Sequence, residues 1–395
     1  MQLFKLMPCR YDSLVATIEG YKKTGVELVA FNNDCMVNGE NIGLGPAGYS
    51  DDIGSYYFIP KLVEIFSINL DTAIQIFYSG SVFLAGIVAI ISSWFFCDTK
   101  LGKCISAIAI ILLSAIVAGI SDTYTFMAIM PLVFIPWWLN VQRQKNPNFV
   151  VLFFITAGII MSCSHLVRSH SATPVIAFVL ISLLFFSDHF SNRLKAFSIL
   201  IFMIVGASVF LAFDSLIEVR IDYLTNIGLS ESISLSGSRI MWHNIYYSLG
   251  YLWNTYDYTG QFLGHEPSDT YSVVKALSIN PDVVLFSAEY ENILRLETIS
   301  FIKNHPLFFL HTIFSKVGVV LMYIILFTNI GLISLLYYSR GTVFNFLFIV
   351  GIGMSSLWCL VGLPLHFYLM GLFTFCTLFG VYNIDYAIKM RTKSF

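Results

Sequence analysis

Charged side chains are scarce in this sequence: they make up only 12% of its 395 residues. Soluble domains carry about 25% charged residues, so the shortage excludes an ordinary soluble globular protein. The formal net charge is −2, which gives no electrostatic reason to expect nucleic acid as a partner. The seven cysteines form no CxxC pair and no zinc-site spacing. Cys9 and Cys35 can form a disulfide only if the N-terminal region lies in an oxidising compartment.

Apolar residues make up 57% of the chain, with a mean hydropathy of +0.76, and they gather in long blocks. A helix needs roughly 20 largely apolar residues to cross a bilayer. The sequence therefore predicts an all-α polytopic membrane protein with about nine spanning helices. These are expected at residues 72–96, 104–120, 125–139, 149–164, 171–187, 196–213, 317–338, 342–361 and 363–384. In the short third segment, Trp137 and Trp138 fit an interfacial aromatic belt.

Four regions follow from this pattern. Residues 1–70 form an N-terminal segment that contains an acidic loop, and 71–213 form a six-helix transmembrane module. Residues 214–316 form a polar, aromatic-rich helical insertion, and 317–395 hold three more spanning helices and a tail. Within the first region, Tyr11 to Tyr21 reads as a short amphipathic helix.

Residues 43–48 match the pattern GxGxxG formally. A dinucleotide site needs a strand before the glycines and a βαβ unit around them. No such context is apparent, and Pro46 interrupts the run, so we expect no nucleotide here.

Basic residues in the connecting segments predict the orientation. One alternate set of connections carries ten of them: Lys100, Lys103, Arg143, Lys145, Arg193, Lys195, Arg340, Lys389, Arg391 and Lys393. The other set (121–124, 165–170 and 363–364) carries only Arg168. Because positive residues mark the cytoplasmic side, we expect the C-terminus inside and residues 1–70 and 214–316 outside. An outer segment of 70 residues with no preceding anchor has three explanations: it is translocated unaided, the first apolar segments are re-entrant, or a first spanning helix lies upstream of Met1. We favour the last.

This topology brings several polar groups to the outer face. Asp51 and Asp52 precede the first span, and Asp122 lies in a tight turn between two later spans. Arg168 lies in a second turn, between His165 and His170. His366 lies at the last outer turn. A carboxylate suits proton removal from an attacking hydroxyl. An arginine or a metal suits a departing phosphate. Asp51 or Asp52 fits the first role, and Arg168 with His165 and His170 fits the second.

Each group also has a structural explanation. Paired aspartates in a loop are commonly turn residues or helix caps, and Asp122 suits an N-cap for the helix that begins near Tyr124. Arg168 at a membrane boundary can reach lipid phosphates. Alternatively, Asp51, Asp122 and His165 supply ligands for a divalent cation such as Mg²⁺ or Mn²⁺. These alternatives stay open at this point.

The 214–316 insertion holds a second group of candidates. Trp242, His243, Tyr246 and Trp253 offer apolar faces on which sugar rings pack, so they are candidate acceptor-binding residues together with His366. The competing interpretation is a small structural cap whose aromatic residues form its own core. Farther along, residues 287–304 show helical spacing that ends at His305-Pro306.

The segment Gly48-Tyr49-Ser50-Asp51-Asp52-Ile53-Gly54 and the turn Ser121-Asp122-Thr123-Tyr124 resemble the two acidic outer loops of the GT-C glycosyltransferase superfamily. Short stretches from Arg168, Trp242 and Glu289 also resemble bacterial members. The resemblance covers most of residues 40–380, but the spanning helix that precedes the acidic loop in the family is absent. It implies a polyprenyl-phosphate-sugar donor, a glycan or glycolipid acceptor, and a catalytic Asp51 or Asp52.

The predicted function is a membrane glycosyltransferase in the cytoplasmic membrane, with its site outside, acting on a cell-surface glycan such as a lipopolysaccharide O-chain. The alternative is a polymerase or ligase of the O-antigen type, which relies on arginines and a histidine rather than paired acids. A transporter is a third class. Transporters place ionisable residues at mid-membrane, whereas spans such as 104–120 and 171–187 hold essentially none there.

Overall fold

The computed structural model describes residues 8–32, 43–48, 52–120, 122–229, 241–254, 267–338 and 342–393. Apart from one short strand pair, the regular structure in these ranges is helical, and eight helices are long and apolar enough to cross a membrane. The shorter apolar helix α8 (Thr173–Phe186) corresponds to the span predicted at residues 171–187. The protein is an all-α, multi-pass membrane protein, as the apolar runs predicted.

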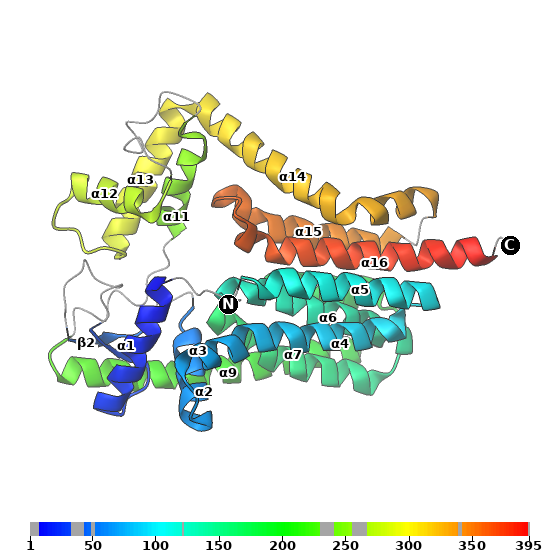
Figure 1. Ribbon diagram of the computed structural model, residues 1–395, viewed down its shortest axis with the longest axis horizontal. Helices are drawn as coiled ribbons and strands as arrows, with labels where there is room; N and C mark the ends of the chain where they lie inside the picture. Colours follow the sequence, from blue (N-terminus) through cyan, green and yellow to red (C-terminus); the bar gives the residue numbers. More distant parts are fainter. Residues whose placement is uncertain are drawn as a thin grey trace.

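The N-terminal region packs as a small layer against one end of the bundle (Figure 1). Helix α1 (Pro8–Thr24) contains the predicted amphipathic segment and packs on strand β1 (Val29–Phe31). Strand β1 precedes the glycine-rich run and pairs antiparallel with β2 (Leu44–Pro46) inside it, so the expectation that no strand precedes this run was wrong. Since the pair is a short antiparallel ladder without a βαβ crossover, it does not form a dinucleotide fold. Helix α2 (Ser55–Phe66) follows.

The transmembrane bundle is built from helices that pass back and forth between two ends (Figure 1). Its first half consists of α3 (Leu70–Gln75), the π-turn Ile76–Gly80, α4 (Ser81–Phe96), α5 (Lys100–Ala118), the 3₁₀ turn Thr123–Thr125, α6 (Phe126–Gln144), α7 (Pro147–Val167), α8 and α9 (Asn192–Asn226). Its second half consists of α14 (Pro306–Tyr337), α15 (Thr342–Val361), the 3₁₀ turn His366–Leu369 and α16 (Met370–Lys393).

Burial separates central helices from peripheral ones. In the most apolar window of each helix, 83% of the residues of α6 and 78% of those of α16 are buried, against 17% in α9 and in α14. Helices α6 and α16 therefore form the centre, while the outer helices expose large apolar side chains such as Phe83 and Leu112. Such a surface suits lipid rather than water. Trp138 is fully buried in α6 against Phe153, so its assignment to an interfacial belt was wrong.

Two helices run past the predicted region boundaries. Helix α9 continues to Asn226 and α14 begins at Pro306, so the boundaries at 213 and 316 fall inside helices. At 1.5 Å per residue, these helices of 35 and 32 residues are about 50 Å long, more than the roughly 30 Å of hydrocarbon. Both therefore extend beyond a bilayer. Lys316 lies buried within the continuous helix α14.

The insertion forms its own helical unit beside the end of the bundle that carries α1 (Figure 1). It contains α11 (Met241–Ser248), the 3₁₀ turn Leu249–Leu252, α12 (Asp269–Ile279) and α13 (Ala288–Asn304). The predicted helical spacing over 287–304 is confirmed as the single helix α13, and the predicted break at His305-Pro306 separates it from α14. A second apolar core, distinct from that of the bundle, holds these helices together.

The basic connections gather at the opposite end of the bundle. Asp98, after α4, is ion-paired with Arg143 at 2.8 Å and with Lys389 at 2.6 Å. The carboxylate of Asp385 accepts the backbone N–H groups of Asp98 and Thr99, both at 3.0 Å. The connection after α4, the end of α6 and the end of the C-terminal helix, which the charge bias assigned to one side, therefore share one end of the molecule. Arg340 lies outside the described residues.

Candidate functional site

The guanidinium of Arg10 joins two acidic residues from separate turns. Its Nε donates to Oδ2 of Asp52 at 2.8 Å, and its Nη1 donates to Oδ1 of Asp122 at 2.6 Å. The residues Asp52 and Asp122 are 0% and 4% exposed, and the side chain of Arg10 is 13% exposed. Burial by itself lowers the pKa of Arg10, but the attraction of the two carboxylates raises it well above its usual value. The three charged groups therefore form one nearly enclosed ionic cluster.

Asp122 also begins the helix that follows it. It is the N-cap of the 3₁₀ turn Thr123–Thr125, and its Oδ1 accepts both the backbone N–H and the hydroxyl of Thr123. The capping role proposed from the sequence is thus present. Because Oδ1 takes all of these bonds and the one from Arg10, the second oxygen, Oδ2, makes no hydrogen bond to any residue in the described ranges. That oxygen has a lone pair left for a substrate.

Glycines allow the loop before α2 to approach its neighbours. The N–H of Gly54 donates to the carbonyl of Leu166 at 2.7 Å, and a Cβ on Gly54 would lie 2.7 Å from the backbone carbon of Leu166. Gly48 has φ +70°, and a Cβ there would lie 2.1 Å from the ring of Tyr56. Only glycine fits either position without displacement. These contacts place Asp52 beside the turn between α7 and α8.

That turn carries Arg168, which lies next to the ionic cluster. The guanidinium carbon of Arg168 is 4.3 Å from the ring centroid of Tyr124, and that of Arg10 is 5.6 Å from the same ring. Tyr124 also contacts the rings of Phe367 and Tyr368, at centroid distances of 4.9 and 4.8 Å. A ring this close to two guanidinium groups attracts both through cation–π interactions. Tyr124 therefore connects the two arginines with the last outer turn.

The two histidines of the turn lie on its side toward α9 and α15. The N–H of His170 donates to Nδ1 of His165 at 3.3 Å, which leaves the proton of a neutral His165 on Nε2. The ring of His165 contacts Phe210, and the ring of His170 contacts Trp358, at 5.6 and 5.5 Å. His170 has φ +64°, an uncommon conformation for a residue other than glycine. Both histidines and Arg168 are partly exposed.

The insertion residues are placed differently from the sequence-based interpretation. His243 and Tyr246 are each 2% exposed and belong to the core of the insertion, so neither offers a surface on which a sugar ring packs. Nδ1 of His243 lies 2.6 Å from the hydroxyl of Tyr290, and Nε2 lies 3.3 Å from Oδ1 of Asp269. For these residues the structural interpretation is correct: they join α11, α12 and α13.

Other predicted acceptor-binding residues retain exposed surface. Trp242 and Trp253 are partly exposed and His366 is exposed. Asp51, the other candidate base, lies outside the described residues, as does Cys35 with its predicted disulfide to Cys9. Of the predicted set, the structure thus brings together Asp52, Asp122, Arg168, His165 and His170.

The predicted divalent-cation site of Asp51, Asp122 and His165 stays a prediction, because Asp51 lies outside the described residues. No group of three histidine, cysteine, aspartate or glutamate side chains in the described part of the chain is arranged to hold a metal ion. The positive charge between Asp52 and Asp122 is supplied by Arg10, and Nδ1 of His165 already accepts a bond.

Arg10 is the residue that sequence reasoning missed. The charge comparison covered only short connections between spans, and Arg10 lies in α1, well ahead of the first span. A single arginine in an amphipathic helix has no distinctive pattern. Its role appears only when α1 packs against the bundle. Comparisons of the chain with protein-family models, with curated proteins and with solved structures give no match.

Proposed function

We propose that this membrane protein is a glycosyltransferase that moves a sugar from a polyprenyl-phosphate donor to a cell-surface glycan or lipid acceptor. The observation that carries the proposal is the joining of Asp52 and Asp122 by Arg10 beside Arg168, at one end of an apolar bundle. Removing charges from water costs several kcal/mol per ion. Clusters of this kind are concentrated at functional sites. The GT-C-like acidic loops agree with the proposal.

The carboxylates serve the attacking group. In the proposed step, a hydroxyl oxygen of the acceptor forms a bond to the anomeric carbon of the donor sugar, and its proton passes to a carboxylate. Oδ2 of Asp122 has the lone pair for this role, whereas Asp52 is completely buried against Arg10. Asp52 then acts as the base only if α1 shifts away; otherwise it positions Arg10.

The basic groups serve the leaving group. When the bond between the anomeric carbon and the phosphate oxygen breaks, its electron pair stays on the lipid phosphate. Arg168 supplies a guanidinium that binds phosphate oxygens through paired N–H donors. His165 and His170 lie on the same turn and complete the proposed phosphate site. Trp242, Trp253 and His366 are the remaining candidates for contact with the acceptor sugar.

The sidedness of the reaction follows from the charge bias. The basic end, with Arg143 and Lys389 around Asp98, is proposed to face the cytoplasm, and the acidic cluster the outside of the cytoplasmic membrane. Polyprenyl-linked sugars presented outside carry their own activation in the phosphate bond. The site therefore has no need of a nucleotide-binding fold.

One observation favours a second candidate, a polymerase or ligase that transfers whole glycan chains. Two arginines, Arg10 and Arg168, lie over one tyrosine beside two histidines. In that case the arginines bind a lipid diphosphate, and Asp52 and Asp122 only position Arg10. The two candidates differ in whether loss of a carboxylate abolishes transfer.

The deciding experiment replaces each acid by its near-isosteric amide. We expect Asp122→Asn, and either Asp51→Asn or Asp52→Asn, to lower sugar transfer about 10²- to 10⁴-fold, the usual contribution of a general base. Transfer is scored as surface-glycan modification in cells lacking the wild-type gene, with protein amounts matched. Asp12→Asn is the matched control, because Asp12 is exposed on the same helix as Arg10. Full modification by all three variants would refute the glycosyltransferase mechanism.

A further inference from the structure

The last outer turn (residues 362–369) connects the candidate site with the insertion. It follows α15 and leads into α16. Its Tyr368 lies 4.8 Å from the ring of Tyr124 between centroids, and the guanidinium carbon of Arg168 lies 4.3 Å from the centroid of the same ring. Near its start, Leu363 belongs to the apolar core of the insertion rather than to that of the bundle. One short segment therefore contacts both parts of the protein.

The end of α15 is held by side chains from other helices. Oγ of Ser248, the last residue of α11, donates to the carbonyl of Val361 at 2.7 Å and to that of Ile245, in its own helix, at 2.8 Å. Nζ of Lys316 in α14 lies 3.5 Å from the carbonyl of Leu360. Ser248 and Lys316 are each 1% exposed, so water has little access to replace them. Because the last carbonyls of a helix have no partner within it, these contacts fix where the last outer turn begins.

Tyr247 on α11 reaches the same turn and is 5% exposed. Its hydroxyl lies next to that of Tyr368, which in turn lies next to the hydroxyl of Tyr124. Burial raises the pKa of Tyr247, and the positive charge of Arg168 acts in the opposite direction. The insertion therefore lies within electrostatic range of Arg168, and three tyrosines lead from one to the other.

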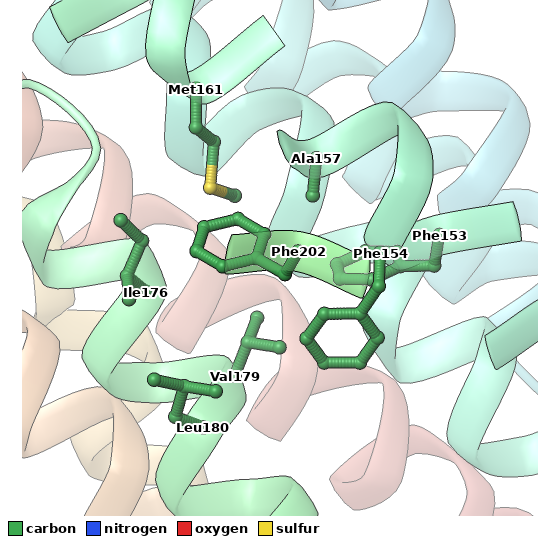
Figure 2. A pocket seen from close by; sticks show the side chains of 8 residues that line it. All are labelled: Phe153, Phe154, Ala157, Met161, Ile176, Val179, Leu180 and Phe202. Carbon is green, nitrogen blue, oxygen red and sulfur yellow. The ribbon is translucent and has the colours of Figure 1, made fainter. Parts of the chain in front are cut away.

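The helices that flank the turn of Arg168 pack against each other through apolar side chains. Met161, Ile176 and Phe202 are among those that line a small hollow between α7, α8 and α9 (Figure 2). Side chains of this kind offer a guanidinium no strong hydrogen-bond partner. The direction of the Arg168 guanidinium is therefore set outside this interface, where the ring of Tyr124 lies against it.

We propose that Tyr247 and Ser248 of the insertion are positioning residues for Arg168. Through the end of α15 and Tyr368, they hold the ring of Tyr124 against the guanidinium. A guanidinium held in one direction presents its paired N–H donors to a phosphate without first having to be ordered. The inference rests on the proposed function, in which Arg168 binds the donor phosphate, and extends it by giving the insertion a part in that site. Neither positioning residue touches the substrate.

The test measures the chemical reactivity of Arg168, a readout that needs no sugar transfer. The full-length protein in phosphatidylcholine nanodiscs is treated with phenylglyoxal, which modifies accessible guanidinium groups, and each arginine is followed by peptide mass spectrometry. Tyr247→Phe and Ser248→Ala should each raise the rate at Arg168 about two- to tenfold, the factor that corresponds to one lost hydrogen bond. Arg193, exposed at the start of α9, should keep its rate in both variants.

Two further variants separate this contact from a general loss of helix stability. Ser278→Ala is the matched control, because Oγ of Ser278 donates to the carbonyl of Lys275 in its own helix but is exposed rather than buried against α15. It should leave the rate at Arg168 unchanged. Ser248→Thr keeps the hydroxyl donor and should return the rate to that of the wild type. If it reacts like Ser248→Ala, the hydroxyl of Ser248 is not what holds the turn.

Unchanged reactivity of Arg168 in both Tyr247→Phe and Ser248→Ala would overturn the proposal. An equal rise at Arg193, or the same rise in Ser278→Ala, would overturn it too, because either result indicates a general loosening of the protein. The assay also separates two failures. Raised reactivity of Arg168, with fully active Asp122→Asn, Asp51→Asn and Asp52→Asn variants, leaves the positioning standing without the proposed chemistry. Unchanged reactivity, with loss of transfer in those three variants, leaves the chemistry standing without the positioning.

Discussion

Arg10 and Asp122 lie 112 positions apart in the chain, yet Nη1 of the arginine is 2.6 Å from Oδ1 of the aspartate. The contact attaches α1 to the transmembrane bundle at the turn before α6. Arg10 also binds Asp52, which lies in the loop that leads to α2. One side chain thus joins the N-terminal layer to the bundle and balances two buried negative charges.

Loss of Arg10 should destabilise the protein strongly. Arg10→Gln leaves Asp52 and Asp122 buried without their cation, and breaking a buried ion pair in this way costs about 3–5 kcal/mol. The measurement is thermal unfolding of the detergent-solubilised protein, with exposed Lys22→Gln on the same helix as the control. Asp122→Asn in the Arg10→Gln background should recover part of the loss, with a coupling of about 0.5–3 kcal/mol. If the stability changes of the two single variants simply add in the double variant, Arg10 and Asp122 do not belong to one ionic cluster.

Gly54→Ala should displace the loop that carries Asp52. The added methyl group would lie 2.7 Å from the backbone carbon of Leu166, where neither segment gives way without loss of the hydrogen bond between them. We expect lower thermal stability and lower transfer activity together. The control is Gly353→Ala in α15, where a Cβ meets no atom within 4 Å; there alanine should be neutral or stabilise by up to about 1 kcal/mol. Equal behaviour of the two variants contradicts the close approach at Gly54.

Cysteine labelling should show the two ends on opposite sides of the membrane. In a cysteine-free background, Lys303→Cys on α13 and Arg193→Cys at the start of α9 are both exposed positions. A membrane-impermeant maleimide added to intact spheroplasts should label position 303, and position 193 should react only after permeabilisation. The reverse pattern inverts the topology and removes the outer location of the site. Position 52 is unsuitable for this test, because Asp52 is completely buried.

His189 should make stability fall at acidic pH. Burial lowers the pKa of His189 below 6.5, and the positive charges of Lys145 and Lys195 lower it further. The folded state therefore holds this proton less tightly than the unfolded chain, so stability is complete above pH 6.5 and decreases as the pH falls through that value. The effect should be small because the side chain is exposed. Thermal unfolding at pH 7.5 and 5.5 should show a smaller loss for His189→Gln than for the wild type. An equal loss of stability in the variant and the wild type contradicts the lowered pKa of His189.

Part of the candidate site could be predicted from the sequence. Asp122, Arg168 and the two histidines lie in short turns between long apolar helices, and adjacent turns at one end of a bundle converge. Asp52 was predicted at the same end of the bundle for the same reason, since it lies in the loop just before the first spanning segment. His243 and Tyr246 were assigned to a glycan-binding surface, although they are buried. Aromatic residues serve equally well in a core and on a sugar-binding surface, and composition does not distinguish the two.

The sequence by itself determined the class of this protein and the order of its helices. Runs of about 20 apolar residues have no stable alternative to spanning helices in lipid, and His305-Pro306 has no place inside a helix. Only the tertiary structure decided that Arg10 lies between Asp52 and Asp122, that Trp138 is buried, and that Gly54 packs against Leu166. These relationships depend on which helix faces pack together, and segments more than a hundred residues apart contribute to one contact.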